Sequence, residues 1–426
     1  MKKIITVVCC SCLLVCSTNA QTLEECRKLA KENYPEIKHY NLLAMSEQFS
    51  LSNAAKAWLP QVVVSGQMTH QSATPTYPEA FSKIMAANGI QMTGLQKDQY
   101  KLSIEVSQNL WGGGQTRANK AIIKADADYQ KSQIDVALYN LNSRVDNLYF
   151  GILLLDARAS LTENTLQVLE GNLSRMKSHL KNGVALQADV DAIEAELLTT
   201  HQHLEQIQAS RNSYRRMLEV FIGRELTDEP LKRPEMTSIQ HHESARPELH
   251  MFAAQSALLD KKRQAIQSSL MPKFSAFAQG FHGYPGMDMF KDMMSKRWTF
   301  NAQIGVRMSW NVTPLYTRKN DLAKLDIAQQ QIDVQRDIFN FNTRMQTVQD
   351  DEAISRLQRA LADDSRIVEL RQSVRIAAES KLQNGVIETT ELLKKIADET
   401  AARLNLTTHE IELLQAIYRL KQTLNQ

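Results

Sequence analysis

Two segments of the chain alternate strictly between apolar and polar residues. Every second residue from Tyr100 to Val106 is apolar, and the same pattern returns over a longer run from Phe300 to Trp310. Because successive side chains of a β-strand point to opposite faces, a period of two predicts an amphipathic strand in each segment. Weaker alternation over 61–70 and 273–282 predicts a partner strand before each of them.

After each strand pair, the pattern changes to that of a long helix. Residues 115–180 contain no proline, and apolar residues recur at steps of four and three at Ile134, Leu138, Leu141, Val145, Leu148, Ile152 and Leu155. This heptad spacing predicts a helix of about 65 residues, which would be about 100 Å long. Asn182-Gly183 and Asn384-Gly385 suit left-handed turns. A helix of about 35 residues returns from each turn, so we predict two antiparallel helical hairpins.

Shorter helices are predicted before the first strand pair. Thr22 and Glu25 have the spacing of a capping box and therefore mark the start of a helix. A second helix is predicted from about Pro35 to Leu59-Pro60, because proline is favourable in a first helical turn and disfavours helix in the residue before it.

The sequence repeats itself in order. Five motifs recur at offsets of 198 to 212 residues: Tyr34-Pro35-Glu36-Ile37 as Arg246-Pro247-Glu248-Leu249, Leu59-Pro60 as Met271-Pro272, Trp111 as Trp310, Gln133 to Val136 as Gln331 to Val334, and Asn182-Gly183-Val184 as Asn384-Gly385-Val386. Such self-similarity indicates a duplicated structural unit. We predict a first repeat over 21–223, a linker over 224–245 and a second repeat over 246–426.

The first 20 residues have the features of a secretory signal peptide. Lys2 and Lys3 precede an apolar run, and small residues lead to a cleavage site after Ala20. Lipidation at Cys16 is an alternative, although Val15 is bulky for such a site. Cleavage after Ala20 would leave Cys26 as the one remaining cysteine, so no internal disulfide is expected.

Composition narrows the class of protein. The 426 residues are 43% hydrophobic, carry a net charge of +3 and include only 15 Gly and 10 Pro. These values do not suggest a disordered chain, a bundle of membrane helices or a nucleic-acid-binding protein. Apart from the signal peptide, no segment approaches the 18 apolar residues of a transmembrane helix. No metalloprotease, nucleophile-elbow or P-loop motif is present, so we expect no enzyme and no cofactor.

The predicted strands are long enough to cross a bilayer when tilted. Only a closed barrel satisfies the backbone hydrogen bonds of strands in lipid, and four strands are too few to close one. Several copies would therefore each contribute four strands: two copies would give eight strands and a packed interior, and three would give twelve and a lumen. A soluble β-sandwich with helical arms is the alternative.

With these elements in order, the sequence resembles the TolC-like outer-membrane efflux factors. The resemblance is carried by Thr22-Leu23-Glu24-Glu25, Asn33-Tyr34-Pro35-Glu36-Ile37, Leu59-Pro60, both Asn-Gly-Val turns, and the strand-to-helix junction Gln108 to Arg117 with Trp111, Gly112, Gly113 and Gly114. It implies a mainly α protein whose four strands complete a transmembrane twelve-stranded β-barrel in a homotrimer, with an α-barrel of helical hairpins extending through the periplasm.

The resemblance also implies a location and partners. Family members lie in the lipid of a Gram-negative outer membrane and conduct passively for efflux or type I secretion. Their partners are a periplasmic adaptor and an inner-membrane pump. The sequence identifies neither the exported substrate nor the pump class. A periplasmic coiled-coil adaptor is the alternative function, but it should contain a single hairpin between β-rich domains.

In the family, the hairpin turns form the periplasmic tip that docks the adaptor and narrows the tunnel. The corresponding residues are Asn182, Gly183, Val184, Asn384, Gly385 and Val386. Asp189 and Glu391 each lie six residues past the tip glycine, and by this resemblance they would form acidic rings of a periplasmic gate. Lys394 replaces the second acid of the family pattern. A solvated helix face is the alternative reading of both acids.

Other chemistry is weakly indicated. Gly112 to Gly114 could cradle a phosphate, but a turn between strand and helix is the simpler reading. Met287, Met289, Met293 and Met294 near His282 could suit Cu(I), and His241, His242 and His250 could bind a metal. Loop and linker settings favour irregular or solvated residues in both cases, so no metal site is predicted.

Overall fold

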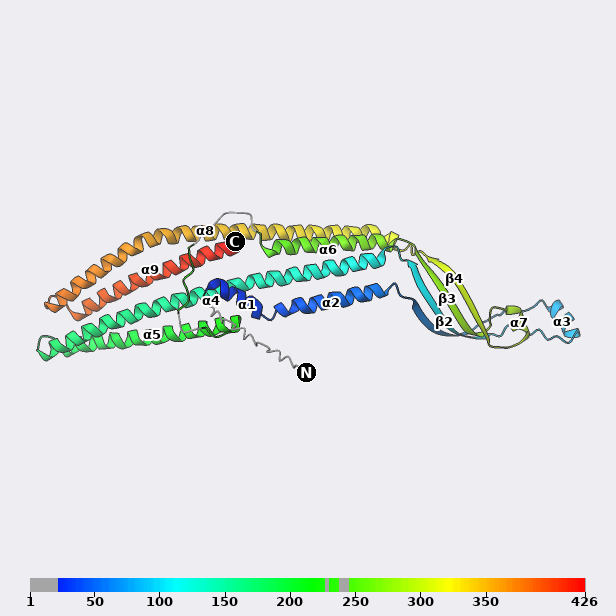
Figure 1. Ribbon diagram of the computed structural model, residues 1–426, viewed down its shortest axis with the longest axis horizontal. Helices are drawn as coiled ribbons and strands as arrows, with labels where there is room; N and C mark the ends of the chain where they lie inside the picture. The colour runs from blue at the N-terminus through cyan, green and yellow to red at the C-terminus, as the bar shows by residue number, and fades with distance from the viewer. Residues whose placement is uncertain (1–21, 227–229, 237–244, 426) are drawn as a thin grey trace, which may run out of the picture. The chain divides into compact units, whose positions relative to one another are not determined.

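The computed structural model describes residues 22–226, 230–236 and 245–425. Along the chain the elements are α1 (Leu23–Asn33), α2 (Ile37–Lys56), β1 (Gln61–His70), α3 (Glu79–Ala87), β2 (Asp98–Trp111), α4 (Gln115–Lys181), α5 (Gln187–Ile222), α6 (Pro247–Ser269), β3 (Lys273–Tyr284), α7 (Met289–Met294), β4 (Thr299–Ser309), α8 (Pro314–Gln383) and α9 (Thr389–Leu424) (Figure 1). The predicted signal peptide, including Cys16, lies outside the described residues, as do His241 and His242.

The predicted helices are present with nearly the expected bounds. The capping box at the start of α1 is complete: the Glu25 amide donates to Thr22 Oγ1 at 3.2 Å, and the Thr22 amide donates to the Glu25 carboxylate at 3.3 Å. α4 spans 67 residues and α8 spans 70, and each is followed by a returning helix of 36 residues. Both helical hairpins are therefore confirmed (Figure 1).

Two short helices were not predicted. α3 lies between β1 and β2, and α7 lies between β3 and β4. Both are shorter than ten residues, so their apolar periodicity is too brief to distinguish them from loop. α7 contains three of the four clustered methionines, and Met293 is buried against Leu95 and Tyr284.

The chain divides into two compact units, and each unit draws on both halves of the sequence. Of the described residues, the first contains 22–40, 133–226, 230–236, 245–250 and 336–425, and the second contains 41–132 and 251–335. The first unit is helical, and the second holds all four strands.

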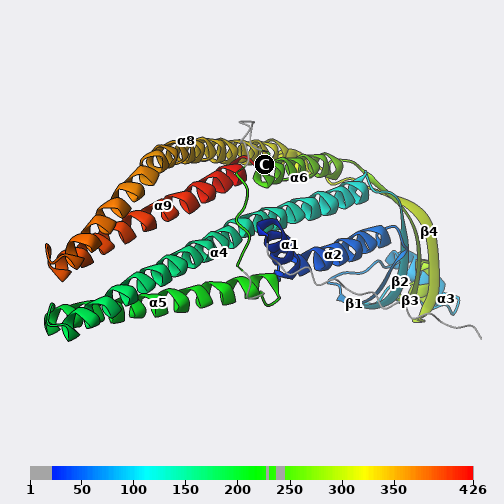
Figure 2. The ribbon, with the colours of Figure 1, turned by 60° about the vertical axis from the view of Figure 1, so that its left-hand side comes forward.

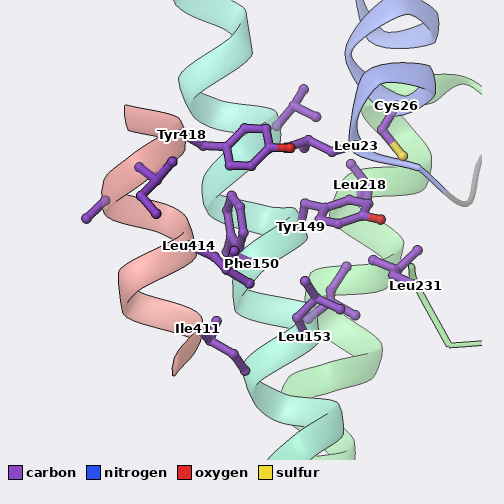
Figure 3. Packing of buried hydrophobic residues seen from close by; sticks show 14 of the residues in the cluster. Leu23, Cys26, Tyr149, Phe150, Leu153, Leu218, Leu231, Ile411, Leu414 and Tyr418 are labelled. Carbon is purple, nitrogen blue, oxygen red and sulfur yellow. The ribbon is translucent and has the colours of Figure 1, made fainter. Parts of the chain in front are cut away.

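The core of the first unit gathers around α4. Tyr149 and Phe150 are almost fully buried, with α1 and α5 on one side of α4 and α9 on the other (Figure 3). The predicted heptad seam accounts for part of this core, because Leu141, Val145 and Ile152 are buried in it. The core also includes Leu226 and Leu231 from the segment after α5, which the sequence pattern did not indicate.

A buried ion pair ties α1 to α4. The Arg27 guanidinium donates to both carboxylate oxygens of Asp146, at 2.7 and 2.6 Å, and lies over the Tyr418 ring of α9. Burial lowers the pKa of Arg27, but the hydrogen bond and charge of Asp146 outweigh it and raise that pKa above its usual value. Beside it, burial together with nearby acidic charge raises the pKa of Cys26 to about 12, so the thiol is unreactive at neutral pH.

The second unit is built on one antiparallel sheet with the strand order β1-β2-β3-β4 (Figure 2). The register pairs Val64 with Ile104 across β1 and β2, Ile104 with Gly280 across β2 and β3, and Ala278 with Ile304 across β3 and β4. Each strand pair predicted from alternation is therefore present, and β2 and β3 join the two pairs. Among the described residues, β1 pairs only with β2 and β4 only with β3, so both edges are free.

The ion pair between Arg27 and Asp146 gives a stability prediction. Arg27→Ala should lower the free energy of unfolding by about 3 kcal/mol, because it leaves the nearly buried Asp146 carboxylate without its partner. Arg366→Ala is the matched control, since its pair with Glu369 is exposed and should be worth no more than about 1 kcal/mol. Urea unfolding followed by circular dichroism measures both; equal losses in the two variants would contradict the prediction.

Candidate functional site

One face of the sheet is apolar and open to its surroundings. The residues that share this face are Val62, Val64 and Met68 of β1, Leu102, Ile104 and Val106 of β2, Ala276 and Ala278 of β3, and Ile304, Val306 and Met308 of β4. Ile304, in the middle of β4, is 85% exposed. A continuous apolar surface of this kind is rare on a soluble monomer and marks a surface that contacts lipid or another protein.

The opposite face of the sheet is polar and internally paired. Arg307 of β4 reaches across β3 to Glu105 of β2, with contacts of 2.9 and 3.4 Å, and lies over the Phe277 ring. Gln303 donates to Gln279 at 2.6 Å, and the hydroxyl groups of Ser65 and Ser103 are 2.8 Å apart. Sequence reasoning missed the Glu105–Arg307 pair, because it did not predict which strands are neighbours.

Aromatic residues mark both ends of the apolar face. At the end near α3 and α7, Trp298 stacks on Tyr100 with ring centroids 6.0 Å apart and also contacts His282. At the end near the long helices, Trp111 packs on Phe274, and the Trp310 indole donates to the Leu270 carbonyl at 3.0 Å. Together with Trp58, just before β1, this accounts for all four tryptophans of the chain.

The junction from Trp111 to Gly114 is a tight turn from β2 into α4. Gly113 and Gly114 have φ values of 65° and 81°, in the left-handed region that favours glycine. A Cβ on Gly113 would lie 2.6 Å from the Cβ of Met271, so the turn requires glycine for close approach as well. The residues of the phosphate-cradle alternative, Gly112 to Gly114, are thus used in this turn. In the second junction, Asn311 Oδ1 accepts from the Thr313 amide at 3.1 Å.

Both hairpin tips have the same backbone geometry. Gly183 and Gly385 have φ values of 72° and 68°. The Val184 amide donates to the His179 carbonyl and the Val386 amide to the Lys381 carbonyl, each at 2.9 Å, which completes a Schellman motif at the end of each long helix. The side chains of Val184 and Val386 are exposed, as are those of Asn182 and Asn384. The tips therefore present small turns with accessible apolar residues.

The two tips lie together around one cavity of about 450 Å³. Its lining includes Gly183, Val184 and Asp189 from the first hairpin and Gly385 and Glu388 from the second. Met176 and Leu382 also line the cavity, and Met176, Val190 and Ile193 of the first hairpin pack against Leu382 and Leu393 of the second. The structure thus brings together tip residues that are 202 positions apart in the sequence.

The two candidate gate acids differ in their surroundings. The Asp189 carboxylate is half-buried, lines the tip cavity and accepts a hydrogen bond from the Leu186 amide at 3.1 Å. It therefore caps the first turn of α5. Glu391 occupies the equivalent position in α9 but is exposed, and among the described residues no ion pair joins it to Lys394. The capping role of Asp189 was not predicted from the sequence, although Leu186 and Asp189 are spaced like the N-cap and N3 residues of a helix.

The remaining candidate residues do not come together as a metal-binding site in the described part of the chain. Across the described residues, no three His, Cys, Asp or Glu side chains gather as a metal site. Met287, Met289 and Met294 are each partly exposed, whereas Met293 is part of a small core. His250 lies in the first turns of α6 and is exposed. None of the described helices is both long and apolar enough to cross a membrane.

Comparison with known families identifies this arrangement. Residues 27–224 match the family model described as "Outer membrane efflux protein". Over these residues, the chain is similar to this family. Among curated proteins, none matches the sequence. The matched segment includes the first tip, the first strand pair and the glycine-rich junction.

Solved structures share the fold over nearly the whole chain. The outer membrane protein VceC from Vibrio cholerae is 14% identical, with a TM-score of 0.67 over 94% of this chain and 95% of VceC. The outer membrane channel MtrE from Neisseria gonorrhoeae, in its open state, is 14% identical, with a TM-score of 0.65 over 95% of this chain and 89% of MtrE. The channel CmeC from Campylobacter jejuni is 11% identical, with a TM-score of 0.64 over 94% and 85%. The predicted fold class is confirmed.

The different environments of the two acids give a second prediction. Asp189→Ala should speed hydrogen exchange of the amides at the start of α5 by about fivefold, because a lost cap costs about 1 kcal/mol. Glu391→Ala is the matched control at the equivalent position of α9 and should leave exchange there nearly unchanged. Exchange followed by mass spectrometry tests this, and equal effects at both sites would rule out a capping role specific to Asp189.

Proposed function

We propose that this protein is the outer-membrane channel of an export system. The exposed apolar face of the sheet carries the proposal, because an aromatic band bounds it at each end. Tyr100 and Trp111 are 11 residues apart, which corresponds to about 36 Å along β2. At a strand tilt of about 45°, this length spans about 26 Å of a bilayer. This matches the apolar band of about 25 Å found on barrels of outer membranes.

We further propose a homotrimer, because the sheet cannot satisfy its own edges in lipid. Three copies would join β4 of one sheet to β1 of the next and complete a barrel of twelve strands. Exposed apolar surfaces on two helices also fit contacts with neighbouring copies. α8 exposes an unpartnered heptad seam at Ile327, Val334, Ile338, Phe341, Met345 and Val348. α2 has no buried residue and exposes Leu42, Met45 and Phe49 at steps of three and four.

The duplicated sequence fits this assembly. We propose that residues 21–223 and 246–426 are two copies of one unit joined by the linker 224–245. In support, α2-β1-β2-α4-α5 and α6-β3-β4-α8-α9 have the same order apart from the short helices α3 and α7. The counterpart of α1 would fall in a segment that is largely outside the described residues.

The proposed partners follow from the tips and from the family. A trimer would carry six tips with exposed Val184 and Val386, suited to docking a periplasmic adaptor that links the channel to an inner-membrane pump. With no site for chemistry among the described residues, the channel would conduct passively and the pump would supply energy and select substrates. Efflux and type I secretion use this same arrangement, and a periplasmic adaptor would not need the exposed apolar sheet.

Two neighbouring residues of β4 test the proposed function. Ile304→Lys introduces a charge at the centre of the apolar face, where about 2–4 kcal/mol is expected against insertion, and should abolish channel events in planar bilayers. Gln303→Lys is the matched control on the polar face and should still form channels of wild-type size. If wild-type protein partitions with soluble proteins, or if Ile304→Lys inserts as well as Gln303→Lys, the membrane channel is disproved.

The gate is a separate proposal. We propose that Glu391 contributes an acidic ring at the narrow end of the channel, since its side chain is exposed and not paired within the described part of the chain. Glu391→Gln should then weaken block by divalent cations and alter single-channel conductance. Lys394→Gln, one turn along the same helix, should have the opposite effect on block. Unchanged block in Glu391→Gln would assign this residue to a solvated helix face.

A further inference from the structure

Three cations that make no ion pair among the described residues lie at one end of the sheet. The strands and their loops, 61–111 and 273–309, contain eight Lys and Arg residues and five Asp and Glu residues. All five carboxylates are engaged: Glu79 with Lys83, Asp98 with His70, Glu105 with Arg307, Asp288 with Lys291, and Asp292 with the Gly286 amide. Five cations therefore make no ion pair among the described residues: Lys97, Lys101, Lys273, Lys296 and Arg297.

Three of these cations stand just beyond the outer aromatic band. Lys97 immediately precedes β2, and Lys296 and Arg297 lie three and two residues before β4, next to Trp298. All three side chains are exposed. Lys101 is different, because it lies on the polar face with its amine 4.2 Å from the Phe281 ring centroid. Lys273 is at the opposite end of the sheet, where β3 begins. We call Lys97, Lys296 and Arg297 the basic collar.

The depth of the collar points to a phosphate layer. Trp298 and Tyr100 stack on the apolar side, where aromatic rings mark the boundary between hydrocarbon and headgroups. The collar lies one to three residues beyond, or about 3–10 Å along extended chain. The headgroup layer on each side of a bilayer is only about 5–8 Å thick. The collar therefore reaches the level of lipid phosphates, and stacked Trp298 fixes the chain beside it.

We propose that the basic collar binds the phosphate groups of an anionic glycolipid in the outer leaflet around the channel. The inference rests on the proposed function, because it needs this end of the sheet to face the outer leaflet. Lys and Arg bind phosphate oxygens with charge-assisted hydrogen bonds, and Arg297 can do so with two donors at once. A trimer would present three collars, one on each copy, at the rim of the barrel.

Lipid binding by purified protein tests the collar. Native mass spectrometry in neutral detergent would count bound molecules of a diphosphorylated lipid A and of the same lipid after removal of its phosphates. The wild type should prefer the phosphorylated form. The triple variant Lys97→Gln, Lys296→Gln, Arg297→Gln should bind it on the order of a hundredfold more weakly, since each basic residue contributes about fivefold at an anionic surface.

A matched triple variant controls for charge. Lys83→Gln, Lys291→Gln, Lys273→Gln removes three positive charges from the same strands and loops, but two of these lysines are paired and the third lies at the far end. It should bind phosphorylated lipid within about threefold of the wild type if general electrostatics contribute little. Equal losses of lipid affinity in the two triple variants, or no preference of the wild type for phosphorylated lipid, would contradict the proposed role of the basic collar.

Two further measurements separate the remaining readings. Inorganic phosphate at the same concentration as the lipid should not displace the lipid. Full displacement would show that the collar binds free phosphate rather than lipid. The size of each variant's assembly in detergent reports whether it folds. If the wild type forms no channels in bilayers, the proposed function is wrong. If the wild type forms channels but the collar variant binds lipid as well as the wild type does, only the proposed lipid site is wrong.

Discussion

The exposed apolar face of the four-stranded sheet is the constraint on which the other features depend. A sheet that meets lipid cannot leave its edge N–H and C=O groups unpaired, and β1 and β4 have free edges in the described chain. In the proposed channel, further copies would supply the missing strands, and the long helices that continue from the strands would then lie beside helices of those copies. The apolar seam of α8 and the apolar side of α2 are likewise exposed surfaces that such copies would cover.

Periodicity predicted the elements well because both kinds of periodicity run for many residues. The alternation in β2 and β4 and the heptads of α4 are long enough that neither can be mistaken for the other, and the Asn-Gly pairs fix where the helices turn. The repeat then predicted that each hairpin has a counterpart. The short helices α3 and α7 escaped because one or two turns leave too few apolar positions to establish a period.

The contacts that join distant segments could not be derived from local pattern. Arg27 and Asp146 are separated by 119 residues, and Glu105 and Arg307 by 202, so neither pair leaves a signal in its own neighbourhood. The tip acids illustrate a different limit. Asp189 and Glu391 hold equivalent positions in sequence, yet only the Asp189 carboxylate accepts a hydrogen bond from the preceding turn. Equivalence within a repeat predicts backbone geometry more reliably than it predicts side-chain roles.

The core around Tyr149 has a consequence for how the chain can fold. α1 and α9 are the first and last helices in the described part of the chain, and Arg27 lies 5.6 Å from the ring centroid of Tyr418, which is 391 residues further along. Leu23, Cys26 and Leu420 are buried in the same cluster. This cluster cannot close until the C-terminal helix has been synthesised, and such non-local closure is slow. Until α9 is available, the apolar side chains of α1 lack the neighbours that bury them in this cluster.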